Sequence, residues 1–435
     1  MSTPAESDAL LSWHKMPLAD WVGGNELQLL RGGDELFPAQ EEAIGAATHE
    51  VWLATYIFHF DAAGAALAAQ LVATARRGVR VRVVVDGFGS RASLPWLQEQ
   101  FADSGVALAV FRPIDRWYSW LQPGQLRRLH QKLCVVDGDH AFVGGINIIG
   151  DRVDLNHGDT DQPRLDFAVG LRGPLVQSVA QAVRAVWTRA WLGRDFGEEL
   201  LALVRSTEPG ARLRRLVQGL RLPRLGRGAL AGQGVAAVEP CLPPVCAAFV
   251  LRDNLRRRRT IERAYIEAIR SAQQRVDLVT PYFYPGHAFR KALRDASRRG
   301  VQVRLLLQGK LDYRIAGMAA QALYAELLGH GVAIYEYTPA YLHAKVCVVD
   351  ESWATVGSSN IDPLSLLLNL EANVIVQDAG FSRHLAAEFE RAVQVSRRVD
   401  MASLGGAGWR GVLRRALVAW AAYVYLRVAG ATGRY

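Results

Sequence analysis

Residues 342–350 read LHAKVCVVD, and LHQKLCVVD stands at residues 129–137, so the chain contains one stretch twice, more than 200 residues apart. Seven of the nine positions are identical. In each copy a histidine and a lysine precede an apolar run that ends at an aspartate. Such a run predicts a buried β-strand with polar residues at its mouth. Because alternate residues of a strand share a face, we expect the histidine and lysine of each copy to point to the same side.

The duplication extends beyond these nine residues. Three further pairs of segments resemble each other: 50–61 and 275–286, 75–87 and 297–309, 103–113 and 329–339. Each half therefore predicts strand, helix, strand, helix, strand, the histidine–lysine strand, a loop and a final helix. This order is typical of an α/β fold with a mixed β-sheet flanked by helices. We expect two similar domains related by a pseudo-two-fold axis.

The length of 435 residues suits two domains of about 200 residues each. We predict an N-terminal domain over 1–204, a basic linker over 205–235, a C-terminal domain over 236–403 and an amphipathic tail over 404–435. Within the linker, residues 205–228 carry seven arginines and one glutamate without a steady period. A helix is predicted over 252–270. Its arginine cluster at 256–259 forms either a solvated face or a contact with an anionic surface.

The net charge of +9 indicates an anionic partner, which composition alone leaves open between nucleic acid, phospholipid headgroups and a phosphorylated substrate. No apolar run reaches the ~20 residues that cross a bilayer, and the N-terminus has no basic signal region. The basic residues comprise 46 arginines and five lysines, and two of the five lysines stand at the matching positions Lys132 and Lys345. This favours a compact ammonium donor there.

Polar residues also recur downstream of each lysine. Four residues separate it from Asp137 or Asp350, and six more lead to Gly-Gly-x-Asn ending at Asn147 or Gly-Ser-x-Asn ending at Asn360. Lysine and asparagine supply donors beside an imidazole, and a glycine-rich turn before a helix start would add backbone N–H groups. One His-x-Lys alone is usually a polar strand end. Two copies with the same downstream residues predict one joint site for a tetrahedral anion.

The motif resembles the HKD signature of the phospholipase D superfamily. The rest of the chain, over about residues 25–400, resembles the bacterial cardiolipin synthases, most closely the B type. The stretches that carry this resemblance are VVVDGFGS (83–90), LDFAVGLRGP (165–174) and WATVGSSNIDPLSLLLNLEANVIV (353–376). The first motif has Gly145 where serine is commoner, so we expect one hydroxyl contact to be missing there.

The resemblance implies a role for each polar residue of the motifs. His130 would be the nucleophile and His343 the acid and base, although the near-symmetric residues themselves leave this assignment open. The phosphate oxygens would be bound by the lysines, the asparagines and one serine: Lys132, Lys345, Asn147, Asn360 and Ser358. Two carboxylates would orient the histidines of the opposite half, Glu371 for His130 and Asp166 for His343. The motif aspartates, Asp137 and Asp350, complete the catalytic signature and are expected to brace it internally. No metal and no cofactor are implied.

The resemblance also implies the reaction and its place. One phosphatidylglycerol would transfer its phosphatidyl group to another through a phosphatidyl-histidine, giving cardiolipin and glycerol. The enzyme would lie peripherally on an anionic surface, at the cytoplasmic face of the inner membrane, without nucleic acid. The alternatives are a phospholipase D-type hydrolase or transphosphatidylase with another donor or acceptor, an HKD nuclease, and a non-catalytic binding protein.

Aromatic residues precede both motifs, at 115–124 and 335–343, and a tail segment at 410–430 carries aromatics between arginines. The two aromatic segments are predicted either to face lipid or to join the core. The tail segment is predicted to be either an in-plane helix on anionic lipid or a packed terminal helix.

Overall fold

The computed structural model describes residues 21–113, 127–155, 158–204, 245–252, 259–310, 323–362 and 369–401, with the backbone alone over 192–204. The predicted linker, the predicted tail, the aromatic segment at 115–124 and the cluster residues 256–258 lie outside these residues. We call residues 21–204 the N-terminal half and residues 245–401 the C-terminal half.

The N-terminal half alternates strands and helices before a run of antiparallel strands and a long helix. Its elements are β1 (Val22–Arg31), α2 (Gly32–Ala46), β2 (Glu50–Thr55), α3 (Ala62–Arg76), β3 (Arg80–Asp86), the 3-10 turn η2 (Arg91–Ser93), α4 (Leu94–Phe101), β4 (Ala107–Phe111), β5 (Lys132–Val136), β6 (His140–Gly144), β7 (Val153–Asp154), β8 (Gly158–Asp159), β9 (Phe167–Arg172) and α5 (Val176–Val204).

The C-terminal half repeats this order. Its elements are β10 (Val245–Arg252), α7 (Thr260–Ser271), β11 (Arg275–Thr280), α8 (His287–Arg298), β12 (Gln302–Gln308), β13 (Ala333–Tyr337), β14 (Val346–Val349), β15 (Trp353–Gly357), β16 (Glu371–Gln377), α11 (Ala379–Gln394) and β17 (Arg397–Val399).

Both halves contribute to one mixed sheet. Among the described residues it has 15 strands, in the order β17-β13-β12-β11-β14-β15-β16-β10-β1-β9-β6-β5-β2-β3-β4. The two first strands, β1 and β10, pair antiparallel at its centre, and outward from this pair the two halves have equivalent strands in the same order. This confirms the predicted α/β class and the internal symmetry. The pairing of β1 with β10 joins the mixed sheets of the two halves edge to edge.

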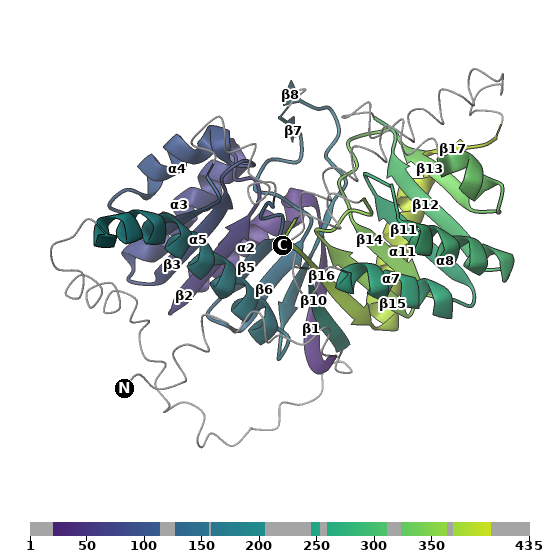
Figure 1. Ribbon diagram of the computed structural model, residues 1–435, viewed down its shortest axis with the longest axis horizontal. Coiled ribbons are helices and arrows are strands. Elements are labelled where there is room, and N and C mark those ends of the chain that lie inside the picture. Colours follow the sequence, from purple (N-terminus) through teal and green to yellow (C-terminus); the bar gives the residue numbers. More distant parts are fainter. Residues whose placement is uncertain are drawn as a thin grey trace.

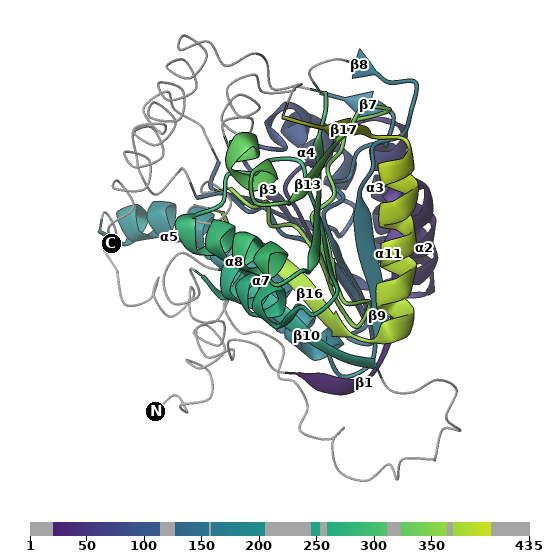
Figure 2. The same ribbon diagram turned by 90° about the vertical axis from the view of Figure 1, so that its right-hand side faces the viewer.

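Helices cover both faces of the sheet, as predicted. In the N-terminal half α2 and α3 pack on one face of the strands and α5 on the other, and in the C-terminal half α7 and α8 pack on one face and α11 on the other (Figures 1 and 2). The strands between them are apolar along most of their length, which suits burial on both faces. For example, β3 reads RVRVVVD and is buried from Val83 to Asp86. None of the helices in the described ranges combines the length and the apolar character needed to cross a bilayer.

The repeated Arg-Arg-Gly after α3 and α8 has a structural explanation. The second arginine of each copy donates to carbonyls at the end of the helix that opens its half: Arg77 to Gly45 and Ala47, and Arg299 to Arg270 and Ala272. A guanidinium satisfies carbonyls that a helix C-terminus leaves unpaired. The duplication therefore preserves a helix-capping contact as well as the strands.

Several predicted elements need correction. Two strands follow each motif strand (β6 and β9, then β15 and β16) where the sequence predicted only a loop, because short apolar runs do not distinguish strand from loop by period alone. The helix expected over 252–270 begins at Thr260, since Arg252 is the last residue of β10. The helix start expected after Asn147 is also wrong, because residues 148–155 form a bridge, turns and β7.

Candidate active site

The segment that carries His130 is held by the opposite half of the molecule. The His130 N–H donates to the Leu370 carbonyl at 3.0 Å, and the Leu370 N–H donates to the Arg128 carbonyl at 2.9 Å. Leu129 and Leu370 thus form an isolated parallel bridge. His130 itself precedes β5, which begins at Lys132. The motif histidine therefore lies at the mouth of the strand, as the sequence predicts.

The second histidine is held in the equivalent way. The Leu165 N–H donates to the Tyr341 carbonyl, and the His343 N–H donates to the Leu165 carbonyl, both at 2.9 Å. Leu165 and Leu342 form the matching parallel bridge, and His343 again precedes its strand, β14. Each motif segment is therefore paired with the carboxylate-bearing segment of the other half.

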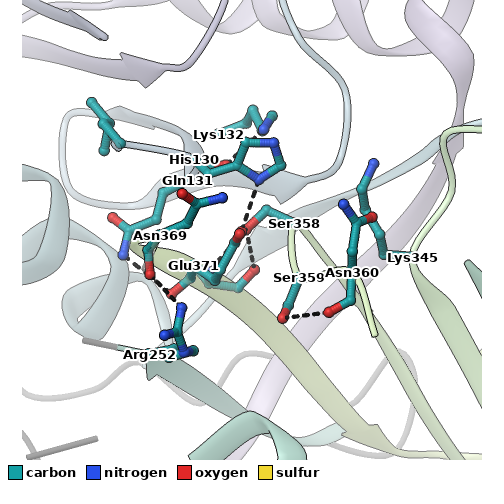
Figure 3. Close-up of polar contacts among 12 residues, drawn as sticks. His130, Gln131, Lys132, Arg252, Lys345, Ser358, Ser359, Asn360, Asn369 and Glu371 are labelled. Atoms are coloured by element: carbon teal, nitrogen blue, oxygen red, sulfur yellow. Dashed lines mark hydrogen bonds and ion pairs between the residues drawn. The ribbon is translucent and has the colours of Figure 1, made fainter. Parts of the chain in front are cut away.

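This exchange places one buried carboxylate against each imidazole. His130 Nδ1 lies 3.0 Å from Glu371 Oε2, and His343 Nδ1 lies 2.6 Å from Asp166 Oδ2. The side chains of Glu371 and Asp166 are 0% and 2% exposed. Figure 3 shows the His130 ring directed at Glu371. A carboxylate that accepts from Nδ1–H selects the tautomer with a free lone pair on Nε2. Both contacts match the cross-pairing that the family resemblance implied.

The two lysines lie behind the histidines and are buried. Lys132 Nζ donates to the His130 carbonyl at 2.6 Å, and Lys345 Nζ donates to the His343 carbonyl and lies 2.7 Å from His343 Nδ1. Burial lowers the pKa of Lys132 to about 7, and the charge of Lys345 contributes to this effect. Burial likewise lowers the pKa of Lys345 to about 8, against the raising effect of Asp166.

The histidines share one electrostatic environment. Burial lowers the pKa of His343 well below its ordinary value, and the charges of Lys345, Lys132 and His130 act in the same direction. Burial also lowers the pKa of His130, although Glu371 opposes it. Both imidazoles are therefore neutral at neutral pH. His130 of the first motif and Ser358 of the second both contact Glu371 Oε2, so residues of both copies meet at one place.

The two orienting carboxylates differ in pKa. Burial raises the pKa of Asp166 to about 6, only partly offset by Lys345 and the Phe167 N–H. Burial acts in the same direction on Glu371, but His130, Lys132 and Ser358 outweigh it, so its pKa lies below the ordinary value. Glu371 is fully ionised near neutral pH. Asp166 approaches half-protonation near pH 6.

Ser358 requires a correction. Its hydroxyl donates to Glu371 Oε2 at 2.5 Å and accepts from the Ala372 N–H at 3.0 Å, and the residue is fully buried. The only proton of this hydroxyl is therefore used on the carboxylate, and Ser358 positions Glu371 instead of binding phosphate. At the equivalent Gly145, a Cβ atom would lie 2.5 Å from Asp166 Oδ1, which explains why this half lacks the hydroxyl.

The predicted asparagines border the lysines. Asn147 Oδ1 accepts from the Ile57 N–H at 3.3 Å, which leaves its amide N–H groups available as donors. Asn360 is 7% exposed and its Oδ1 is buried without a hydrogen-bond partner. Figure 3 shows Asn360 and Lys345 extending in the same direction. Amide and ammonium donors at this place suit the non-bridging oxygens of a phosphodiester.

The motif aspartates lie at the far ends of β5 and β14. Asp137 accepts four hydrogen bonds from residues 48–50, and Asp350 accepts three from the N–H groups of residues 273–275. His130 and Asp137 are seven residues apart along an extended segment that includes β5, which corresponds to a separation of roughly 20 Å. Their grouping with the catalytic residues is therefore wrong, and the expected internal brace agrees with the contacts.

We expect Asp137→Asn to lower the free energy of unfolding by about 1–3 kcal/mol, because the amide keeps one acceptor oxygen and faces several N–H groups with a donor. Urea unfolding measures this loss. Activity per folded molecule and its pH profile should stay unchanged. The matched control is Asp139→Asn at an exposed position two residues away, where a change within about 0.5 kcal/mol is expected. An altered pH profile in Asp137→Asn would contradict the brace.

Three site residues were missed by the sequence prediction. The ring of Tyr56 lies 5.0 Å from that of His130, and Lys132 Nζ lies 5.5 Å from the Tyr56 ring centre. Asp86 accepts from the Leu129 N–H at 2.8 Å and from Arg128 Nε at 2.9 Å, which fixes the segment before His130. Arg164 lowers the pKa of His343 through its charge. Tyr56 follows the apolar strand β2, and Asp86 is the last residue of the apolar strand β3. A polar residue at the end of an apolar strand was the sequence signal that could have identified them.

Known proteins resemble this chain over most of its length. The family profile described as "Cardiolipin synthase, PLD-like domain" matches residues 41–159 and 265–393. The chain is 36% identical over 369 residues to cardiolipin synthase B of Shigella flexneri, covering 84% of this chain and 79% of that protein. It is 34% identical over 404 residues to cardiolipin synthase B of Salmonella typhi, covering 91% and 87%.

A solved structure shows the same fold. The phosphatidylserine synthase of Haemophilus influenzae aligns with a TM-score of 0.60 and 13% sequence identity, covering 98% of both chains. At this identity the likeness concerns the fold alone. The profile matches each half separately, and the sequence relatives span most of both halves. The chain therefore belongs to the cardiolipin synthase family of phospholipase D-like proteins.

Proposed function

We propose that this protein is a phosphatidyltransferase that makes cardiolipin and glycerol from two phosphatidylglycerols. The observation that supports this proposal most strongly is the crossed arrangement of His130 with Glu371 and of His343 with Asp166. It presents two neutral imidazoles, each with Nδ1 fixed, beside two ammonium groups. Such a pair supplies both a nucleophile and an acid–base group for a phosphodiester.

In the first half-reaction, Nε2 of His130 forms a bond to phosphorus, and the bond from phosphorus to the glycerol headgroup oxygen breaks. His343 donates a proton to this oxygen, and glycerol leaves. The bound phosphodiester anion raises the pKa of the acid histidine, which favours its protonated form. The products are a phosphatidyl group on His130 and a neutral His343.

In the second half-reaction, His343 takes a proton from the headgroup hydroxyl of the second phosphatidylglycerol. The hydroxyl oxygen bonds to phosphorus, the bond from phosphorus to Nε2 breaks, and cardiolipin leaves. Lys132, Lys345, Asn147 and Asn360 hold the non-bridging oxygens, and their attraction strengthens as charge develops in the pentacoordinate state. Both histidines return to their starting protonation.

The protein is proposed to act as a peripheral protein at the cytoplasmic face of the inner membrane. The family membership and the net charge of +9 support an anionic lipid surface as its partner, since basic proteins are attracted to acidic headgroups. The lipid substrate itself resides in such a surface.

Radiolabelled phosphatidylglycerol in detergent micelles tests the reaction. The expected products are cardiolipin and glycerol in equal amounts, separated and identified by mass. Phosphatidic acid as the main product would mean that the enzyme is a hydrolase and not a transferase. Cleavage of single-stranded DNA without lipid turnover would reject both lipid activities.

The lysine pKa values predict how kcat/KM changes as pH rises above neutrality. Because the pKa of Lys132 is about 7 and that of Lys345 about 8, both ammonium groups of the free enzyme lose their charge as pH rises through this range. We expect kcat/KM to fall as pH rises above about 7, chiefly through a higher KM. Lys132→Arg keeps a charge at high pH and should move the falling limb upward, even if its maximal rate is lower. If kcat/KM falls over the same pH range in the unmodified enzyme and in Lys132→Arg, the assignment of this fall to Lys132 is wrong.

A further inference from the structure

Three loops beside the active site are joined to one another. Ser90 Oγ donates to the Tyr56 carbonyl and accepts from the Phe58 N–H, both at 3.0 Å. The His59 N–H donates to the Ile148 carbonyl at 2.8 Å. The Gly150 N–H donates to Asp61 Oδ2 at 2.7 Å. Hydrogen bonds therefore connect residues 56–61, 87–91 and 147–155 into one group of loops.

This group of loops borders the reacting groups. Its first loop begins with Tyr56, whose ring lies 5.0 Å from the His130 ring. Its third loop begins with Asn147, one of the proposed phosphate donors, whose Oδ1 contacts the first loop at the Ile57 N–H. The hairpin of β7 and β8, at the end of the third loop, projects from the body of the protein in both views (Figures 1 and 2).

Each of the three loops exposes one large apolar side chain. Phe60 is 51% exposed, Phe88 40% and Leu155 50%. They account for three of the seven exposed large apolar side chains among the described residues, although the loops are a small part of the chain. We call Phe60, Phe88 and Leu155 the apolar rim. Exposed apolar side chains gathered around a site mark a contact surface.

Two arginines next to the apolar rim carry exposed positive charge. Arg91 lies three residues after Phe88, and Arg152 lies three residues before Leu155. The Arg152 side chain is 55% exposed and its ion pair with Asp34 is long, at 3.7 Å. Long basic side chains beside apolar ones suit the boundary between acidic headgroups and acyl chains.

We propose that the apolar rim inserts into the interface of a bilayer that contains anionic phospholipid, with Arg91 and Arg152 at headgroup depth. This proposal rests on the proposed function, because it takes the substrate to be a diacyl phospholipid. The phosphodiester of such a lipid lies at the bilayer surface. Removing the whole lipid into water would expose both acyl chains, at a cost that grows with every methylene group. An inserted rim beside His130 lets the phosphate reach the histidines while the chains stay in the bilayer.

The test separates membrane contact from catalysis. The variant Phe60→Ser/Phe88→Ser/Leu155→Ser is assayed for flotation with phosphatidylglycerol vesicles, for turnover of the same vesicles and for turnover of dihexanoyl phosphatidylglycerol below its micellar concentration. We expect vesicle binding and vesicle turnover to fall at least about tenfold, and turnover of the monomeric lipid to stay within about twofold.

Two further variants control for the general loss of exposed apolar area and for folding. Trp191→Ser/Met401→Ser removes exposed apolar side chains elsewhere on the chain and should bind vesicles like the unmodified protein. Phe60→Leu/Phe88→Leu keeps the apolar character and should retain vesicle binding. Thermal unfolding of each variant verifies that it is folded.

Unchanged flotation of the triple serine variant would overturn the proposal, and so would an equal loss of turnover on monomers and vesicles. Loss of binding in the Trp191/Met401 control equal to that in the rim variant would overturn it as well. Failure of the proposed function gives a different result: the unmodified protein would make no cardiolipin from either substrate, while flotation would still report on the apolar rim.

Discussion

His130→Ala and His343→Ala are each expected to reduce cardiolipin formation by about 10⁴-fold. The reason is that each histidine has a distinct proton or bond to transfer, and the groups near it do not replace it. The lysines already donate to the histidine carbonyls, and the carboxylates lie on the Nδ1 side of the rings. Neither set therefore occupies the position of Nε2.

The measurement is initial-rate formation of cardiolipin from labelled phosphatidylglycerol. His384→Ala is the matched control, because His384 lies exposed on α11 and its removal should leave the rate unchanged. Substantial activity in either active-site variant would reject the two-histidine scheme.

A covalent intermediate distinguishes the two roles. If His130 is the nucleophile, rapid alkaline quenching of the unmodified enzyme should leave the phosphatidyl group on the peptide that contains His130. The same label on the peptide that contains His343 would reverse the assignment of nucleophile and acid. Mass spectrometry of the digested protein decides between them.

Glu371→Gln is expected to lower kcat by about 10²–10⁴-fold with a smaller change in KM. The amide has no negative charge to stabilise the His130 imidazolium, and it offers a donor as well as an acceptor to Nδ1. The wrong tautomer then places a proton on Nε2. Because Glu371 and Ser358 are fully buried, water does not readily replace the lost interaction.

Two companion variants test whether the effect acts through His130. Ser358→Ala removes the hydroxyl that holds Glu371 Oε2 and should produce a smaller loss than Glu371→Gln, again in kcat. Glu351→Gln removes the charge of a 45% exposed carboxylate beyond the far end of β14 and should leave kcat unchanged. Near-normal kcat in Glu371→Gln, or a loss confined to KM, would contradict the orienting role.

Much of the site was predictable from the sequence because the duplication marks it. Two copies of His-x-Lys with the same downstream spacing identified the histidines, the lysines and the asparagines, and hydrophobic periodicity identified β2, β3 and β4 with their counterparts β11, β12 and β13. These signals are local, since each depends on residues close together along the chain. The crossed carboxylates came from the family resemblance, as no spacing in the sequence relates Glu371 to His130.

The tertiary structure decided the remaining features. The pairing of β1 with β10, which merges the halves into one sheet, joins residues about 220 positions apart and leaves no periodic signal. The direction of the Ser358 hydroxyl depends on the position of a buried carboxylate from another strand. The lowered lysine pKa values and the neutral histidines arise from burial where the two halves meet. Composition and order thus determined which groups are present, whereas packing determined their charge, their partners and the atoms that they present to a substrate.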